Sequence, residues 1–289
     1  LYSNMPYSDV GNYTFDTYLD YVQQGIYLWE NSPYVKNYPE LYFLNYVLFH
    51  RTNDEEIKPC RTYFWKKIKD KVQGKAMVEA ALEINHWCAG EVMYQGTDMR
   101  TGSALEIYRS GVGRCGEEAV FVVNVMRSAG IPARPVYVPR WSHCDDNHAW
   151  VEVWCDGDWH YLGACEPEAV LDKGWFTNAA SRAMMIGSRW YDRAMPDEKV
   201  IGKDGMNRII NLLGKYAKTR WITITVEDLD GTPAAGAKVR AEVMNYGEFS
   251  PIAIMEADKN GCISFETGFG SLLICAVYDG AYGEKVIDT

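Results

Sequence analysis

The stretch from Gly111 to Trp175 limits the possible folds more than any other part of the chain. A glycine-punctuated loop leads into an apolar segment that begins near Cys115 and ends at Gly130-Ile-Pro. Glycine there suits a left-handed helix cap and proline cannot continue the helix, so the segment predicts one apolar helix. Asp156-Gly157 predicts a two-residue hairpin turn. The strands that we expect around this turn cover residues 136–138, 148–154 and 159–164.

The segments on either side of this stretch differ in periodicity. Apolar residues at helical spacing between residues 39 and 88 predict helices, and Asn53 or Asp54, followed by two glutamates, is typical of a helix cap and first turn. From Trp221 onward the apolar period is two, with Asp-Gly and Asn-Gly turns, which is typical of a β-sandwich. The predicted fold class is therefore α+β. Its expected parts are an N-terminal helical region at 1–74, a core at 75–217 and an all-β sandwich at 218–289.

The charge argues against several classes of partner. The chain has 29 Lys and Arg residues against 39 Asp and Glu, and the formal charge of -10 repels phosphate backbones and anionic lipid surfaces. We therefore expect no nucleic-acid partner. No apolar run approaches the ~20 residues that a membrane span needs. The sequence starts Leu-Tyr-Ser, so we expect that a signal segment is absent from this chain.

Among the eight cysteines, Cys115 is the one that its surroundings favour as a reactive thiol. At the start of a helix, unpaired backbone N–H groups and the helix dipole stabilise a thiolate and lower the thiol pKa. The glycines at 111, 113 and 116 allow close backbone approach, and the N–H of Cys115 is a candidate oxyanion donor. The alternative is a buried structural cysteine. The cysteines contain no C-x-x-C pair, which fits neither a small disulfide scaffold nor a typical zinc module.

A thiol nucleophile needs a base, and His148, at the start of an expected strand, is the candidate. The competing histidines are His50, His86, His143 and His160. A metal site is the competing interpretation, because Cys and His suit zinc. Its ligands would come from His143, Cys144, Asp145, Asp146 and His148. That site requires five neighbouring residues on one short stretch to converge, so we expect neither a metal nor a cofactor.

Four motifs follow one another in this part of the chain. They are Gly-Val-Gly-Arg-Cys-Gly-Glu at 111–117, Arg-Ser-Ala-Gly-Ile-Pro-Ala-Arg at 127–134, Asn-His-Ala-Trp-Val-Glu-Val at 147–153 and Trp-His-Tyr-Leu-Gly-Ala-Cys-Glu at 159–166. Together they resemble the transglutaminase-like superfamily of papain-related thiol enzymes. The Gly-Arg-Cys-Gly-Glu run and the closing Cys-Glu are most similar to its peptide N-glycanase branch. The resemblance implies a papain-like core at 75–217, with Cys115 as nucleophile and His148 as general base.

The third position of the family's triad departs from this pattern. The family places an Asp four residues after the hairpin tryptophan, and residue 163 of this chain is glycine. Extending the hairpin pairing sets Trp150 opposite Gly163 and His148 opposite Cys165, so that Gly163 lies on the His148 face. Glu166 or Asp146 is then expected to orient the imidazole in place of the missing carboxylate. Loss of catalysis is the alternative.

The C-terminal stretch Asp-Gly-Thr-Pro-Ala-Ala-Gly-Ala-Lys-Val at 230–239 resembles the carboxypeptidase regulatory-like sandwich. This Ig-like module is a frequent appendage of secreted bacterial proteins. The resemblance implies an extracytoplasmic location, whether periplasmic, surface-attached or secreted. It implies no activity, because such sandwiches often act as spacers or docking surfaces.

Two hypotheses for the function follow. In the first, a thiol enzyme cleaves or exchanges an amide bond in a peptide, protein or glycopeptide: Cys115 attacks the carbonyl, His148 moves the proton, and water or an amine resolves the thioester. Hydrolysis and acyl transfer both remain open. In the second, the chain is a catalytically impaired binding module that keeps the cleft and holds a glycan or peptide with its aromatic residues.

Overall fold

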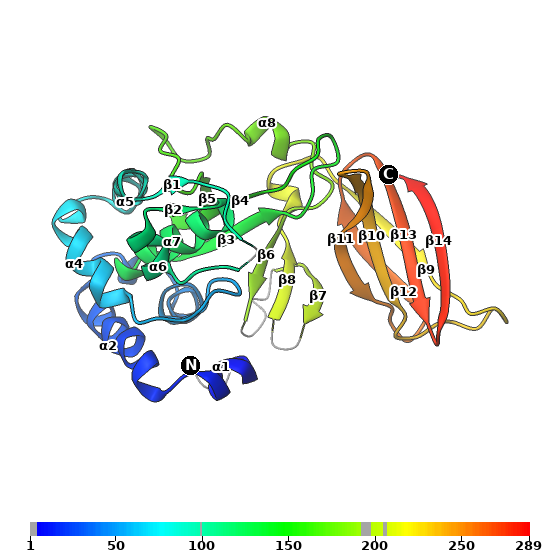
Figure 1. Ribbon diagram of the computed structural model, residues 1–289, viewed down its shortest axis with the longest axis horizontal. Coiled ribbons are helices and arrows are strands. Elements are labelled where there is room, and N and C mark those ends of the chain that lie inside the picture. Colours follow the sequence, from blue (N-terminus) through cyan, green and yellow to red (C-terminus); the bar gives the residue numbers. More distant parts are fainter. Residues whose placement is uncertain (1–4, 99, 192–197, 205–206) are drawn as a thin grey trace. The chain divides into compact units, whose positions relative to one another are not determined.

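The computed structural model describes residues 5–98, 100–191, 198–204 and 207–289. Within this range the chain forms two compact units. The first comprises the described residues up to 136 together with 149–174, and the second comprises 137–148 and the described residues from 175 to 289. The elements of both units are labelled in Figure 1. None of the helices in the described residues is both long and apolar enough to cross a membrane.

The helices belong mainly to the first unit. They are α1 (Tyr7–Asn12), α2 (Phe15–Asn31), α3 (Glu40–Phe43), α4 (Arg61–Val72), α5 (Met77–Glu91), α6 (Ala104–Ser110), α7 (Cys115–Ser128) and, in the second unit, α8 (Thr177–Ala180). Shorter helical turns are the 3-10 turns η2 (Val35–Asn37) and η4 (Leu213–Lys215) and the π-helical turn η3 (Leu44–Leu48).

The strands are distributed over both units. They are β1 (Met93–Tyr94), β2 (Val112–Gly113), β3 (Ala133–Val138), β4 (His148–Cys155), β5 (Asp158–Leu162), β6 (Gly187–Trp190), β7 (Val200–Asp204), β8 (Asn207–Asn211), β9 (Arg220–Thr225), β10 (Lys238–Asn245), β11 (Glu248–Glu256), β12 (Cys262–Thr267), β13 (Ser271–Tyr278) and β14 (Ala281–Asp288). Together with the helices they confirm the predicted α+β class.

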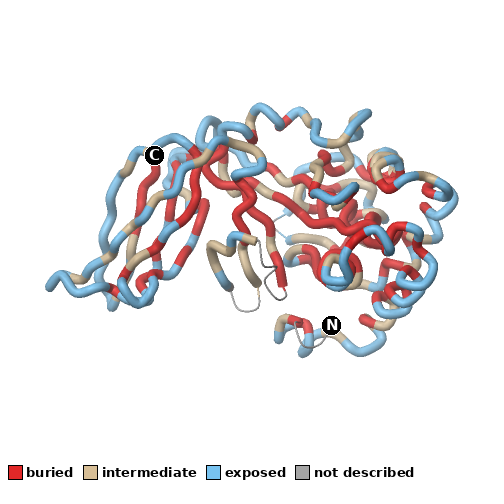
Figure 2. Tube along the Cα trace, turned by 180° about the vertical axis from the view of Figure 1, so that it is seen from behind, coloured by how far each residue is buried: buried red, intermediate tan, exposed pale blue. Residues whose placement is uncertain are grey.

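Helix α7 is the buried centre of the first unit. Every residue from Glu117 to Ser128 is buried, as expected for a helix that is apolar around most of its circumference (Figure 2). Helices α4, α5 and α6 pack against it. Its end follows the glycine and proline signals, because Gly130 adopts a left-handed φ of 83°. The structure thus confirms the predicted helix from Cys115 to the Gly130-Ile-Pro stop.

Side chains from the N-terminal helical region complete the C-terminal end of α7. Tyr38 Oη donates a hydrogen bond of 2.7 Å to the carbonyl of Gly130, and Gln24 Nε2 donates one of 3.1 Å to the carbonyl of Ser128. The last carbonyls of a helix have no partner within the helix, so these donors replace the water that burial excludes. The N-terminal region therefore packs on the core through polar as well as apolar contacts.

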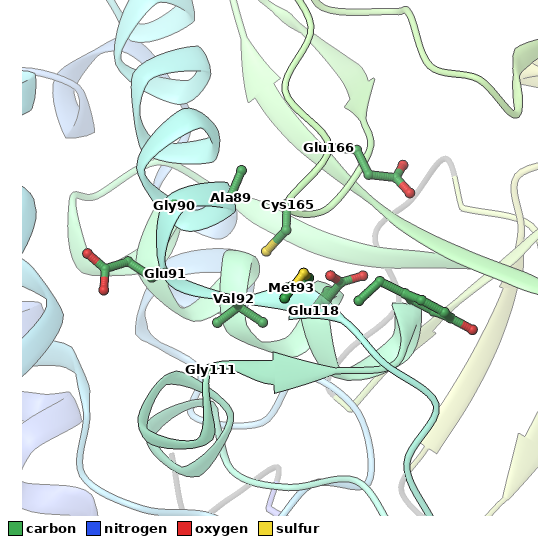
Figure 3. A pocket seen from close by; sticks show the side chains of 10 residues that line it. Ala89, Gly90, Glu91, Val92, Met93, Gly111, Glu118, Cys165 and Glu166 are labelled. Carbon is green, nitrogen blue, oxygen red and sulfur yellow. The ribbon is translucent and has the colours of Figure 1, made fainter.

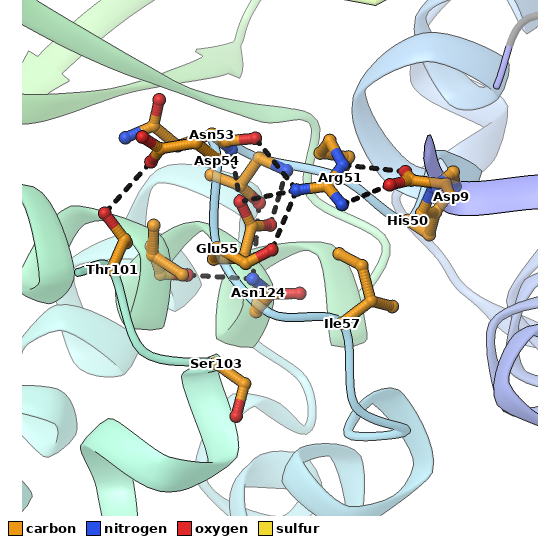
Figure 4. A network of polar contacts seen from close by, with 12 residues as sticks. Asp9, His50, Arg51, Asn53, Asp54, Glu55, Ile57, Thr101, Ser103 and Asn124 are labelled. Atoms are coloured by element: carbon orange, nitrogen blue, oxygen red, sulfur yellow. Dashed lines mark hydrogen bonds and ion pairs between the residues drawn. The ribbon is translucent and has the colours of Figure 1, made fainter. Parts of the chain in front are cut away.

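The helix predicted to begin at Asn53 or Asp54 is absent from the structure, and that prediction is wrong. Residues 51–60 contain no helix, and the carboxylate of Glu55 instead accepts hydrogen bonds from the backbone N–H groups of Thr52 (2.7 Å) and Asn53 (2.6 Å). Figure 4 shows this turn and its connection through Arg51 to Asp9. Pro59 also disfavours helical backbone at the residue before it. Helix α4 accordingly starts only at Arg61.

Strands β4 and β5 form the predicted hairpin. Asp156 and Gly157 take positive φ values of 52° and 96°, as a two-residue turn requires, and the pairing runs from Cys155 with Asp158 to Val151 with Leu162. Beneath this hairpin, Arg134 Nε donates a 2.7 Å hydrogen bond to the carboxylate of Glu152, and both side chains are buried. Two residues of the motifs therefore form a structural ion pair.

The C-terminal part of the second unit is an antiparallel all-β region. Its strands form a four-stranded sheet in the order β11-β10-β13-β14 and a two-stranded sheet of β12 and β9 (Figure 1). Met184 and Met185, which precede β6, belong to the same apolar core as these strands. Thr267 Oγ1 fixes this segment by donating a 2.8 Å hydrogen bond to the carbonyl of Met184.

Candidate active site

Cys115 is the first residue of α7, in the first unit. Arg114 precedes it as the N-cap, and Glu117 completes a capping box by accepting a 3.2 Å hydrogen bond from the Arg114 N–H. Glu117 also accepts hydrogen bonds from Thr97 Oγ1 (2.5 Å) and the Gly102 N–H (3.1 Å). These contacts fix Thr97 and Gly102 to the helix start. Cys115 therefore begins a helix whose first turn is held rigidly.

The thiol of Cys115 is less acidic than its helix position suggests. Burial raises its pKa, and the charge of Glu118 raises it further. Hydrogen bonds from the backbone N–H groups of Ala149 and Gly116 act in the opposite direction but do not cancel the effect of burial. Our expectation of a lowered pKa is therefore wrong, because desolvation of the thiolate outweighs the stabilisation from the helix start.

His148 is the first residue of β4 and belongs to the second unit. Only 6% of its surface is exposed, and the rings of Trp175 and Phe176 lie with their centroids 4.7 and 5.0 Å from its own. Burial lowers the pKa of His148 to about 4, although the charge of Asp146 acts against this. The imidazole is therefore neutral at pH 7 and has a nitrogen that is able to accept a proton.

The predicted pairing of the hairpin does not extend beyond Leu162. Gly163 instead forms a bridge with Glu166, and Cys165 takes a positive φ of 57° between them. The predicted pairing of Trp150 with Gly163 and of His148 with Cys165 is therefore wrong, because the chain turns at residue 163. We refer to residues 163–166 as the Glu166 turn.

The side chain of Asn85, in α5, holds the Glu166 turn through hydrogen bonds. Its Nδ2 donates a 2.9 Å hydrogen bond to the carbonyl of Gly163, and its Oδ1 accepts a 3.0 Å bond from the Cys165 N–H. Asn85 is 1% exposed, so these bonds satisfy both ends of a buried amide. Sequence reasoning missed this residue, although a polar residue beside the apolar stripe of 75–88 was a visible signal.

The side chain of Glu166 occupies the space that a side chain at residue 163 would need. An ideal Cβ atom placed on Gly163 would lie 2.8 Å from Glu166 Cβ and would overlap its carboxylate. Glycine at 163 and the position of Glu166 therefore depend on each other. This is the position at which the family resemblance implies a carboxylate.

A pocket of about 430 Å³ lies next to the Glu166 turn. Glu91, Glu118 and Glu166 line it together with Cys165, and the carboxylate of Glu91 points away from Glu118 (Figure 3). Burial, and secondly the charge of Glu166, raises the pKa of Glu118 to about 8. Glu118 is the second residue of the candidate site that the sequence analysis did not single out.

The remaining candidate residues take part in other contacts. Asp146 is exposed, and its Oδ1 accepts a 2.7 Å hydrogen bond from the Asn147 N–H. His50 Nε2 lies 2.9 Å from Asp9 Oδ2, and His160 Nδ1 lies 2.6 Å from Asp172 Oδ2. In the part of the chain that the structure describes, no three His, Cys, Asp or Glu side chains are placed to hold a metal ion.

One protein-family model matches part of this chain. The family model described as "Transglutaminase-like superfamily" matches residues 66–164, a range that contains Cys115, His148 and Gly163. No curated protein matches the chain.

Solved structures of low similarity also match. A putative cysteine protease from Cytophaga hutchinsonii is 19% identical, with a TM-score of 0.32, and the match covers 52% of this chain and 57% of that one. LapG of Legionella pneumophila is 13% identical, with a TM-score of 0.32 and coverage of 52% and 76%. Red sea bream transglutaminase is 10% identical, with a TM-score of 0.35 and coverage of 92% and 57%. Residues 66–164 of this chain, which include the buried helix that begins at Cys115, are therefore similar to the transglutaminase-like superfamily.

Proposed function

We propose that the protein is a thiol-dependent amide-bond hydrolase or acyl transferase in which Cys115 is the nucleophile and His148 the general base. The effect of the Ala149 N–H, which lowers the pKa of the Cys115 thiol, carries this proposal. Ala149 follows His148 directly in the chain, so this effect supports a pairing of the thiol with the imidazole. The family match over residues 66–164 supports thiol chemistry at the level of the superfamily.

The directions of the two pKa shifts define how the pair would react. With the pKa of Cys115 raised and that of His148 lowered, both groups are neutral at rest. His148 would remove the thiol proton as the sulfur attacks the amide carbonyl, and would then give that proton to the leaving amine. Water or a second amine would resolve the thioester. Water as the acceptor gives hydrolysis, and an amine gives acyl transfer.

Glu166 is proposed to supply the carboxylate that orients His148. Its side chain fills the space next to Gly163, where the resemblance implies the family's acidic residue. A carboxylate beside an imidazole fixes its tautomer and stabilises the imidazolium that forms during the reaction. Asp146 is the alternative, because its charge already raises the pKa of His148.

The substrate is proposed to be a peptide, protein or glycopeptide. Within this class, the Gly-Arg-Cys-Gly-Glu run and Cys165-Glu166 favour testing a glycosyl-asparagine bond, by their similarity to the peptide N-glycanase branch. The all-β region is proposed to be a carboxypeptidase regulatory-like, Ig-like spacer or docking module. On the same resemblance we propose an extracytoplasmic location.

A panel of peptide, isopeptide and glycosyl-asparagine substrates tests the proposal, with and without an added primary amine. Cys115→Ala should abolish turnover and leave the thermal unfolding profile unchanged. Cys155→Ala is the matched control, since Cys155 lies in the same unit and outside the candidate site, and it should keep activity. Turnover that survives in Cys115→Ala would reassign the nucleophile. If folded wild type turns over no substrate while it binds one of them, the alternative of a binding module is correct.

A further inference from the structure

The pocket beside the Glu166 turn carries an excess of negative charge. Three of its lining residues are glutamates, and no Lys or Arg is among the described residues that line it. We call it the carboxylate pocket and define it by Glu91, Glu118, Cys165 and Glu166. Buried carboxylates are normally paired with a cation or a hydrogen-bond donor. Glu118, which is the buried one of the three glutamates, therefore favours a positive ligand or a bound proton.

Glu118 is the side chain that indicates a ligand. It is 3% exposed, and no hydrogen bond to its carboxyl group is found among the described residues, where burial and the charge of Glu166 act on it. The neighbouring Glu117 is also buried, but its carboxylate oxygens accept bonds from Thr97, Gly102 and Arg114. The two adjacent glutamates thus have different roles. Glu117 closes the helix start, whereas Glu118 faces the pocket (Figure 3).

The walls of the pocket suit a long side chain with a charged end. Met93 and Tyr94 line it and are 70% and 66% exposed, so an apolar surface lies at its entrance. Lysine and arginine have this combination of an aliphatic stem and a cationic head, and they cover apolar surface with the stem while the head meets a charge. A volume of about 430 Å³ is at the lower end of ordinary ligand sites and exceeds what one such side chain needs.

We propose that the carboxylate pocket binds the cationic side chain of a lysine or arginine in the peptide or protein substrate, beside Cys115. Naming the bound molecule as a substrate rests on the proposed function, whereas the binding itself does not. Glu118 follows Cys115 by one turn of α7, and its carboxylate, when ionised, raises the pKa of the thiol. A cation held there would place the neighbouring amide of the same peptide close to the nucleophile.

Binding of a cation to this pocket should release a proton. Glu118 has a pKa of about 8, so at pH 7 it holds a proton. The titratable groups that line the pocket or interact with Glu118 are Glu166, Glu91 and the thiols of Cys165 and Cys115. None of these is positive, and a bound cation would therefore favour the ionised form of Glu118. The proton would leave to solvent as the ion pair forms.

Isothermal titration calorimetry of the full chain carrying Cys115→Ala tests this, because that variant binds without turnover. The probes are acetyl-Ala-Arg-Ala-amide and the same peptide with citrulline, which has the shape of arginine without its charge. We expect the arginine peptide to bind at least about tenfold more tightly, which a charge-assisted contact supplies. Its binding enthalpy at pH 7 should depend on the ionisation enthalpy of the buffer, because a proton is released.

Adding Glu118→Gln should remove both the preference for arginine and the dependence on buffer. Glu83→Gln is the matched control, since it removes one charge from α5 outside the pocket, and it should change neither. Equal affinity for the two peptides would overturn the proposal, and so would a buffer-independent enthalpy. The comparison of peptides uses an unaltered pocket, so it stands even if Glu118→Gln fails to fold. If the arginine peptide shows no preference, the wild-type Cys115 thiol can still be tested for turnover. Failure of the binding proposal is therefore distinguishable from failure of the proposed function.

Discussion

The carboxylate of Glu166 occupies the space where Gly163 would carry a side chain. An ideal Cβ on residue 163 would come within 2.8 Å of Glu166 Cβ, a separation at which neither atom can remain in place. The backbone of the Glu166 turn creates this arrangement, since Gly163 bridges Glu166 and Asn85 holds the turn through two hydrogen bonds. A side chain at 163 and the present position of Glu166 therefore exclude each other.

Glu166→Gln should lower turnover by about 10²-fold if Glu166 orients His148. Amidation of the orienting aspartate in a serine protease costs about 10⁴, and a cysteine site depends on that group less because its thiol is the stronger nucleophile. Steady-state kinetics with the most active amide substrate measures the effect. Asp146→Asn is the control and should leave turnover nearly unchanged. The opposite ranking of the two variants would assign the orienting role to Asp146.

Moving the acidic side chain from residue 166 to residue 163 tests whether turnover can be rescued. Gly163→Asp alone should inactivate or destabilise the protein, because the new side chain collides with Glu166. Gly163→Asp combined with Glu166→Gly removes the collision and should recover part of the turnover lost in Glu166→Gln. If the double variant folds and is less active than Glu166→Gln, the two side chains are not equivalent.

Alkylation of Cys115 by iodoacetamide should keep accelerating as the pH rises above 9. Only the thiolate reacts, and burial raises the pKa of Cys115 above its ordinary value of 9.0. Glu118→Gln removes a negative charge that contributes to this rise, so its profile should shift to lower pH. Mass spectrometry of tryptic peptides at a series of pH values measures the rate at Cys115 alone. A rate that levels off near pH 7 would contradict the raised pKa.

Loss of the buried pair between Arg134 and Glu152 should destabilise the first unit strongly. Glu152→Gln leaves the Arg134 guanidinium buried without a counter-charge, and breaking such pairs costs about 3–5 kcal/mol. Glu256→Gln breaks the exposed pair with Lys238 and should leave the free energy of unfolding nearly unchanged, because solvent screens such a pair. Urea unfolding of both variants gives the two free energies. Equal and small losses would show that Arg134 finds another partner.

Acid should loosen helix α1 before the rest of the first unit. Burial alone would raise the pKa of Asp9, but hydrogen bonds from His50 and Arg51 lower it below its ordinary value of 3.8 (Figure 4). A carboxyl that is more acidic when folded stabilises the fold above its unfolded pKa, and this contribution is lost as the pH falls below about 4. Hydrogen exchange of the α1 amides should therefore accelerate in that range. Asp9→Asn should show fast exchange already at pH 7.

The sequence predicted those parts of the molecule that local patterns determine. Glycine and proline after Ser128 marked the end of α7, and Asp156-Gly157 set the register of the β4–β5 hairpin. The Glu166 turn was not predictable in this way. Its geometry depends on Asn85, which lies 78 residues earlier in the chain than Gly163. Local periodicity contains no information about such a contact.

The pKa values of the site residues could not be predicted from local sequence patterns for the same reason. A helix start favours a thiolate, but the pKa of Cys115 is set mainly by burial, which depends on elements distant in sequence. The carboxyl of Glu118 is likewise raised by burial and by Glu166 from another element. Sequence reasoning identified Cys115 and His148 as candidates through motif order, and the assignment of their roles stays a prediction.

The central claim is that His148 activates Cys115, and inactivation by a peptidyl fluoromethyl ketone tests it most directly. The reagent reacts with a cysteine that a neighbouring base activates, and mass spectrometry identifies the labelled residue. We predict that the label is on Cys115 in the wild type and that His148→Ala slows inactivation by about 10²- to 10⁴-fold, the usual contribution of a general base, while the fold is retained. Labelling of another cysteine, or an unchanged rate in folded His148→Ala, would contradict the account.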